Sequence, residues 1–334
     1  MMEFHEFCEY LKEHVKDYLP NDLKDAEVSL ATIQKNNGTE LTGLSIRASG
    51  KSISPNIYLD NFYQQYRQGM DPDLACEHVA QMHIQNMNPG QALAEAVDHF
   101  QDVDFIKSHV VVALVNAQKN EKMLADMPYR LKEDLAIIYK VYIGNDGDSI
   151  GTITVKNEHL KAWGITADEL HECAMRNSKD LMPVEVQDIG SLLMGMGLDL
   201  PVPDLSGGPM LYVISNKQKC NGAAGILYSD CLEKLSEKLG TDLYILPSSV
   251  HETLALSAGI SEVQILAEMV REVNATQVSP QEQLSDHVYR YDAKAKTITL
   301  ADVSVKDLNL SFAAENAGER ETAKAEAGRS RHHR

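Results

Sequence analysis

The 334-residue sequence has few cysteines, and none of them are paired at a spacing used for redox chemistry or zinc. It contains five, an odd number without any C-x-x-C pair: Cys8, Cys76, Cys173, Cys220 and Cys231. Disulfide scaffolds need a dense, even set of cysteines, and zinc sites need ligands at short spacing. We therefore expect reduced and mostly buried thiols, as in cytoplasmic proteins.

Long hydrophobic runs are also missing. A membrane helix needs about 20 consecutive apolar residues, whereas the most apolar runs, 110–115 and 211–214, have the length of strands. The N-terminus is acidic and amphipathic, unlike a secretory signal with its basic start and continuous apolar segment. These absences predict a cytoplasmic protein without membrane contact.

Basic residues are scarce relative to acidic ones. The sequence has 31 Lys and Arg against 49 Asp and Glu, a formal charge of −18. This balance disfavours direct nucleic-acid binding, which needs clustered Lys and Arg. Residues 313–334 are slightly basic, whereas residues 1–30 hold eight acidic and three basic side chains. An acidic surface maintains solubility and could also meet a basic protein partner.

Recognisable cofactor and catalytic motifs are absent. There is no G-x-x-x-x-G-K-[ST] loop, no G-x-G-x-x-G turn and no G-x-S-x-G elbow. His171-Glu172 and His251-Glu252 each begin like the zinc motif H-E-x-x-H. The second histidine is replaced by Met175 and Ala255, so the second zinc ligand is missing. We therefore predict no cofactor.

The remaining pattern predicts an α+β fold with mostly antiparallel, hairpin-built sheets and flanking helices. Asn36-Asn37-Gly38 and Gly144-Asn145-Asp146-Gly147 are typical of hairpin turns. Asp71 before Pro72 marks a helix start, and 166–169 form a capping box. Strands are expected at many short apolar segments, among them 210–214 and 223–228.

Composition divides the chain into regions. Residues 190–209 are rich in Gly, Met and Pro, which is typical of a loop or linker between an N-terminal region, 1–189, and a C-terminal region, 210–302. Residues 303–334 form a tail. From about residue 313 the tail lacks large apolar side chains, so we expect disorder there.

One short segment offers candidate catalytic residues. A serine beside a histidine and a carboxylate is a residue set that hydrolases use. However, neighbours along a strand point to opposite faces, and a turn in which Pro and Ser satisfy exposed backbone groups explains the same letters. The candidates are Ser248, Ser249, His251 and Glu252, with Asp286 and His287 as residues that the fold could bring close.

A polar loop at 216–225 offers candidate ligand-binding residues. It contains Lys217, Lys219 and Asn221 together with two glycines, between two predicted strands. Lysine ammonium groups and backbone N–H groups together can bind an anion. A solvated hairpin loop has the same composition, so both interpretations stay open.

Cys76, His78 and His83 are weak candidates for a metal site. On one helix, positions 76 and 83 share a face, whereas 78 lies well round from them. Ligands from elsewhere, such as His99 or His109, would be needed to complete a site. Ordinary surface and core side chains explain the cluster without a metal, and we predict none.

Six segments together carry a resemblance to a known family. They are 41–44, 54–59, 163–172, 216–224, 243–252 and 284–289. Through these segments, residues 1 to about 302 resemble a bacterial family that is known as domain of unknown function fifty-six eighty-eight. A second bacterial family without assigned activity is weakly similar to 163–177 and 210–256.

The resemblance implies no activity, cofactor or site residue, because the family has none assigned. The residues themselves favour a cytoplasmic, non-catalytic binding or adaptor protein with an acidic surface. Its predicted partner is another protein with a basic face. The alternative is a hydrolase-like enzyme centred on residues 248–252.

Overall fold

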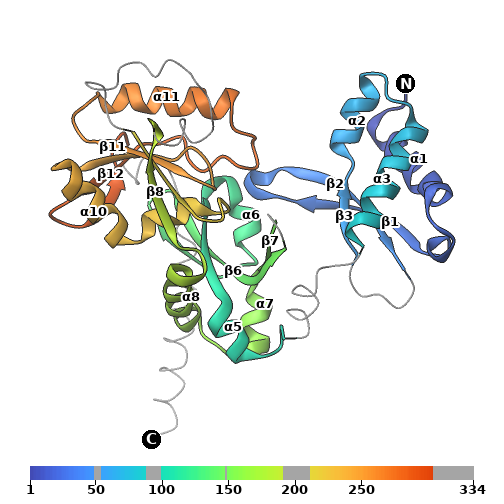
Figure 1. Ribbon diagram of the computed structural model, residues 1–334, viewed down its shortest axis with the longest axis horizontal. Coiled ribbons are helices and arrows are strands. Elements are labelled where there is room, and N and C mark those ends of the chain that lie inside the picture. Colours follow the sequence, from blue (N-terminus) through green and yellow to red (C-terminus); the bar gives the residue numbers. More distant parts are fainter. Residues whose placement is uncertain (49–53, 88–98, 147–148, 191–210, 304–334) are drawn as a thin grey trace, which may run out of the picture. The chain divides into compact units, whose positions relative to one another are not determined.

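The chain divides into two compact units, Met1–Ala94 (unit 1) and Glu95–Arg334 (unit 2). The computed structural model describes residues 1–48, 54–87, 99–146, 149–190 and 211–303. Helices alternate with three sheets, and every strand pair is antiparallel (Figure 1). The predicted α+β class is therefore confirmed.

Among its described residues, unit 1 combines three α-helices with one small sheet. In chain order its elements are α1 (Phe4–His14), β1 (Glu27–Gln34), β2 (Glu40–Arg47), β3 (Asn56–Tyr58), α2 (Asp60–Arg67) and α3 (Pro72–Asn86). The predicted hairpin turn lies between β1 and β2, where Asn37 has a φ of 59°. Asparagine tolerates this left-handed conformation better than most residues, so the sequence fixes this turn locally.

The core of unit 1 forms between the apolar faces of its helices and its sheet. Phe7 and Leu11 point inward from α1, Leu44 and Ile46 from β2, and Val79 from α3. The two leucines and the phenylalanine are all fully buried. At about 2 kcal/mol for each buried large apolar side chain, this cluster is the main force that holds unit 1 together.

His83 is the polar exception in this unit. Its side chain is 2% exposed, and its Nδ1 has no hydrogen-bond partner among the residues that the structure describes. Burial lowers the pKa of His83, because the charged imidazolium loses its hydration there. Unit 1 therefore holds this side chain neutral.

We expect the stability of unit 1 to fall as the pH drops below 6.5. There the unfolded chain takes up a proton that the folded His83 resists, so protonation favours unfolding. His83→Leu should reduce this pH dependence, as measured by hydrogen exchange of the α3 amides between pH 7.5 and 5.5. His78→Leu on the same helix is the control. Equal pH slopes for the two variants would contradict the prediction.

Unit 2 contains the other two sheets. Its elements are α5 (Val103–His109), β4 (Val110–Asn116), α6 (Glu121–Leu124), β5 (Tyr129–Lys132), β6 (Leu135–Asp146), β7 (Ser149–Thr154), α7 (Asn157–Trp163), α8 (Ala167–Leu181), β8 (Val184–Asp188), β9 (Tyr212–Asn216), the 3₁₀ helix η6 (Gly222–Leu227), α10 (Ser229–Leu239), β10 (Leu243–Leu246), β11 (Thr253–Ser257), α11 (Val263–Thr276), β12 (Tyr289–Asp292) and β13 (Thr297–Leu300).

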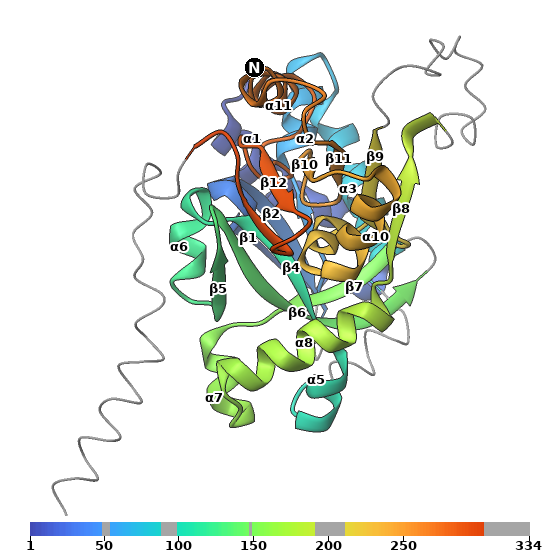
Figure 2. The same ribbon diagram turned by 90° about the vertical axis from the view of Figure 1, so that its left-hand side faces the viewer.

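The two sheets of unit 2 share one large core. The six-stranded sheet has the order β13-β12-β10-β11-β9-β8, and in the other sheet β6 pairs with β4, β5 and β7. Alternate residues of β4 and β10 enter the shared core, which α8 and α10 complete. The opposite faces pack on α6 and α11. Figure 2 shows α8 running beside β4 and β6, below the larger sheet.

This layering explains the apolar run at 110–115. All seven residues of β4 are buried, because the strand is covered on both faces. A strand buried on both faces shows a continuous apolar run instead of alternation. The apolar run 110–115, which has the length of a strand, therefore lies within β4.

The segment after the polar loop was predicted wrongly. Residues 223–228 form the 3₁₀ helix η6 and the residue after it, instead of a strand. Small residues allow this close packing: a Cβ at Gly225 would lie 3.1 Å from Ile214 and 3.2 Å from Val184. A Cβ at Gly222 would lie 2.3 Å from the Ser215 hydroxyl.

The unit boundary differs from the division expected from composition. It lies at 94/95, inside the predicted N-terminal region. Strands β8 and β9, on either side of the predicted linker 190–209, pair in one sheet. Within the described residues both flanks of that segment thus belong to unit 2, whereas 191–209 itself lies outside the described residues, as does the predicted disordered tail from 313.

No helix in the described part of the chain is long and apolar enough to cross a membrane.

Candidate functional site

The candidate catalytic segment is the turn between β10 and β11. The Ser249 N–H donates to the Glu252 carbonyl, and the His251 N–H donates to the Ser249 hydroxyl, each at 3.1 Å. The Ser248 N–H donates to the Leu246 carbonyl at 3.0 Å. A hydroxyl that accepts from the backbone two residues on is a common turn device. These contacts agree with the interpretation of this segment as a turn in which serine satisfies exposed backbone groups.

The ring of His251 contacts residues outside its own turn. Its Nδ1 accepts from the Asn221 N–H at 3.3 Å, and its Nε2 lies 3.9 Å from a Glu282 carboxylate oxygen. The Ser215 hydroxyl donates to the His251 carbonyl at 2.8 Å. Among the contacts of the described residues, His251 is therefore brought together with the loop after β9 and with Glu282.

The candidate ligand-binding residues lie in that loop but face different surroundings. The Asn216 side chain closes the loop, since it accepts from the Cys220 N–H and donates to the Cys220 carbonyl. Lys219 and Asn221 both have a φ of 52°. Lys217 is exposed, Lys219 lines a large pocket, and Asn221 lines a small cavity of about 10 Å³.

The candidate metal ligands all lie on α3 of unit 1. Cys76 and His83 are buried, whereas His78 is partly exposed. Burial raises the pKa of the Cys76 thiol to about 12, which keeps it protonated and a poor ligand. Across the described ranges no group of three His, Cys, Asp or Glu side chains could hold a metal ion. In unit 2, His99 and His109 each stack on the ring of Phe105.

A buried polar network that the sequence did not predict lies around Asp134. This carboxylate is 3% exposed, in the turn between β5 and β6. It accepts from the Ser285 hydroxyl at 2.5 Å and from the Tyr289 hydroxyl. Burial raises the pKa of Asp134, whereas the two hydroxyl donors and the charge of His287 lower it.

Asp286 and His287 belong to the rim of this network instead of the 248–252 turn. His287 Nδ1 lies 3.0 Å from Asp302 Oδ2, and this contact raises the pKa of His287. Asp286 accepts from Lys119 at 3.1 Å and from Asn274 at 2.8 Å. With Ser285 fully buried, the centre of the network connects structural elements of unit 2.

We expect Asp134→Ala to lower the free energy of unfolding of unit 2 by about 3 kcal/mol, because it leaves two buried hydroxyls without an acceptor. Denaturant unfolding followed by the fluorescence of Trp163 measures this change. Tyr289→Phe should cost about 1 kcal/mol, since only one hydrogen bond is lost. Glu158→Ala on exposed α7 is the control; a loss at Asp134 no larger than the control would refute the role of the network.

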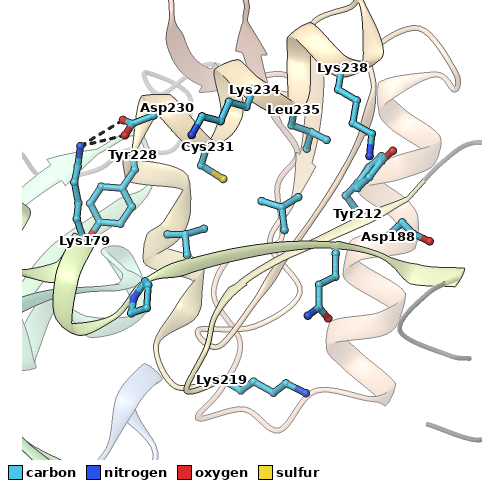
Figure 3. A pocket seen from close by; sticks show the side chains of 14 residues that line it. Lys179, Asp188, Tyr212, Lys219, Tyr228, Asp230, Cys231, Lys234, Leu235 and Lys238 are labelled. Carbon is cyan, nitrogen blue, oxygen red and sulfur yellow. Dashed lines mark hydrogen bonds and ion pairs between the residues drawn. The ribbon is translucent and has the colours of Figure 1, made fainter. Parts of the chain in front are cut away.

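Unit 2 contains a pocket of about 990 Å³, here called the lysine pocket. Strand β8 and helix α10 form its walls, and Tyr212 of β9 lies at one end (Figure 3). Four lysines and two aspartates line it: Lys179, Lys219, Lys234, Lys238, Asp188 and Asp230. The local charge is thus positive in a strongly acidic protein.

The lysines of the pocket differ in what they contact. Lys179 lies 3.4 Å from both carboxylate oxygens of Asp230, and Lys238 lies over the Tyr212 ring at 4.8 Å from its centroid. Lys234 and Lys238 are four residues apart and therefore neighbours on one face of α10. Two like charges at this spacing repel each other unless an anion lies between them.

Cys231 shares the pocket but is not an activated nucleophile. Burial and, less strongly, the charge of Asp230 raise the pKa of its thiol to about 11, against a smaller opposite effect of Lys234. The neutral thiol is the weakly nucleophilic form. The lining therefore offers lysine charge and apolar surface, which suit binding.

Most of the pocket was missed by sequence reasoning. Lys219 was one candidate for ligand binding, with a solvated loop as the other interpretation, and it lines the pocket. Lys234 and Lys238 were not singled out from the sequence, although their four-residue spacing beside Cys231 and Leu235 was a visible signal.

Comparison with known proteins gives one match. A sequence family described as a family of unknown function (DUF5688) matches residues 4–293. No curated protein and no solved structure matches the chain.

Proposed function

The chain belongs to this family of unknown function, and from the chemistry of its own residues we propose that it acts by binding an anionic ligand in the lysine pocket. The observation that carries the proposal is the contrast of charge. Four lysines line one pocket of a protein whose net charge is −18. Clustering four lysines costs electrostatic energy because their charges repel one another, and a bound anion offsets this cost.

The lining favours binding over catalysis. The lining residues that the structure describes include no histidine, serine or glutamate, and the Cys231 thiol is held protonated. General acid–base catalysis needs a group whose pKa lies near the working pH. The support for a binding or adaptor protein is therefore stronger than for an enzyme at this site.

The hydrolase alternative around Ser248, Ser249, His251 and Glu252 has weaker support. A nucleophile and its base must lie within hydrogen-bond reach. The Ser249 hydroxyl instead accepts from the backbone of His251, whose ring meets Asn221 and Glu282.

We expect the lysine pocket to bind citrate, a small trianion, in isothermal titration calorimetry at low ionic strength. The variant Lys234→Gln/Lys238→Gln should weaken binding about tenfold, since losing two cationic contacts of about 0.7 kcal/mol each amounts to about 1.4 kcal/mol. Raising the salt concentration should weaken binding of the wild-type protein as well.

Lys122→Gln/Lys161→Gln is the matched control, because it removes the same charge from exposed positions of unit 2 outside the pocket. Equal affinities for the two double variants would locate the anion elsewhere and contradict the proposal. Absence of citrate binding to the wild-type protein would do so too.

A second proposal concerns unit 1, whose acidic surface could receive a basic protein partner. Seven acidic side chains within its first 27 residues are exposed: Glu3, Glu6, Glu13, Asp17, Asp22, Asp25 and Glu27. Complementary charge accelerates association and makes it dependent on salt. This supports the adaptor function predicted from the composition, with a partner of basic surface.

We expect a labelled hexalysine peptide to bind the full chain, as measured by fluorescence anisotropy. The variant Glu13→Gln/Asp22→Asn/Asp25→Asn should weaken this binding severalfold, because it removes three exposed negative charges from unit 1. Glu158→Gln/Glu172→Gln/Glu237→Gln removes three exposed charges from unit 2 and serves as the control. A loss no greater than in this control would count against unit 1 as the docking surface.

A further inference from the structure

We infer that the lysine pocket receives an extended acidic peptide, which adds as a strand to the open edge of β8. The inference rests on the proposed function, because it identifies the anion that the pocket takes. It draws on three independent features: the backbone of β8, the direction of α10 and the apolar part of the lining.

Within the described residues β8 is the last strand of the six-stranded sheet, with β9 on one side only. The Lys217 N–H donates to the Pro183 carbonyl, and the Ile189 N–H donates to the Leu211 carbonyl. In an antiparallel pair, such hydrogen-bonded positions alternate with positions whose N–H and C=O point outward. Positions 184 and 186 therefore turn their backbone groups away from β9.

These outward groups are available for pairing. Among the described residues, neither Val184 nor Val186 has a hydrogen bond from these groups to a loop or a helix. An edge strand with open N–H and C=O groups is a template for another extended segment. The outward N–H and C=O groups of β8 can thus form hydrogen bonds with a peptide backbone, which a small anion lacks.

The helix supplies a matching row of charge. In Figure 3, α10 runs above β8 in the same direction, with Asp230 above the start of the strand and Lys238 above its end. Residues four apart on a helix are about 6 Å apart along its axis. Alternate residues of a strand are about 6.6 Å apart. Acidic side chains at alternate positions of an added strand therefore match Lys234 and Lys238.

The apolar part of the lining suits the rest of such a peptide. The side chains of Val184 and Val186 share one face of β8, and Leu235 faces the pocket from α10. Val186 is 38% exposed, unusually open for a valine in a sheet. An added strand would cover this surface, whereas a small hydrophilic anion would leave it in water.

The decisive probe is a six-residue peptide that alternates Glu and Thr, with blocked ends so that it carries three negative charges like citrate. Calorimetry with the full chain should give a dissociation constant at least tenfold lower than that of citrate, because backbone hydrogen bonds add to the charge contacts. A Lys–Thr peptide of the same length should not bind.

Two N-methylated versions of the peptide test strand addition itself. In a strand, alternate N–H groups point to opposite sides, so methyl groups on odd or on even amides block opposite edges. One pattern should weaken binding at least tenfold and the other should leave it nearly unchanged. Equal behaviour of the two patterns, whether both bind or both fail, overturns the inference.

A protein variant gives the complementary test. Val186→Pro removes an outward N–H without removing a bond to β9, and should weaken the peptide at least tenfold while citrate binding persists. Trp163 fluorescence shows whether unit 2 of this variant is still folded. If unit 2 is not folded, the N-methylated peptides, measured with the wild-type protein, test strand addition instead. Citrate binding without tighter peptide binding refutes the added strand and leaves the proposed function intact, whereas failure of both ligands refutes both.

Discussion

The buried carboxylate of Asp134 connects the two sheets of unit 2. Asp134 leaves the turn between β5 and β6 and accepts hydroxyl hydrogen bonds from Ser285 and Tyr289, which belong to the region of the larger sheet. Removing a charge from water is expensive, so a buried carboxylate is tolerated only where donors meet it at the right place. Apolar packing between sheets allows sliding, but this directional contact does not. It therefore fixes one register between the two layers.

The pocket follows from that layered arrangement. The shared core brings residues of η6, α10 and β9 together. Gly222 and Gly225 permit the close approach, since a Cβ at either would meet neighbouring atoms. Strand β8 is the edge strand of the larger sheet among the described residues, and α10 lies beside it. The space between β8 and α10 is the lysine pocket. The proposed binding surface thus lies at the edge of the shared core of unit 2.

The sequence predicted local structure better than tertiary placement. The largely apolar β4, the β1–β2 hairpin and the Thr166 cap were predictable, because each depends on residues close together in the chain. Segment 223–228 was not, since its 3₁₀ conformation depends on contacts with β9. The same limit applies to function: Lys179, Lys219 and Lys234 lie on three separate elements, and only the fold gathers them. Asp134 was missed because its partners lie 151 and 155 residues away.

The burial of the cysteines has a practical consequence for chemical labelling. Burial raises the pKa of the thiols of Cys8, Cys76 and Cys231 to between about 11 and about 12, raises that of Cys220, and Cys173 is buried too. Alkylating reagents and mild oxidants attack the exposed thiolate, so the native chain is slow to react with them. A cysteine introduced at a chosen surface position would therefore be the fastest to react. The native fold itself offers selective attachment of a fluorophore or spin probe without first removing the natural thiols.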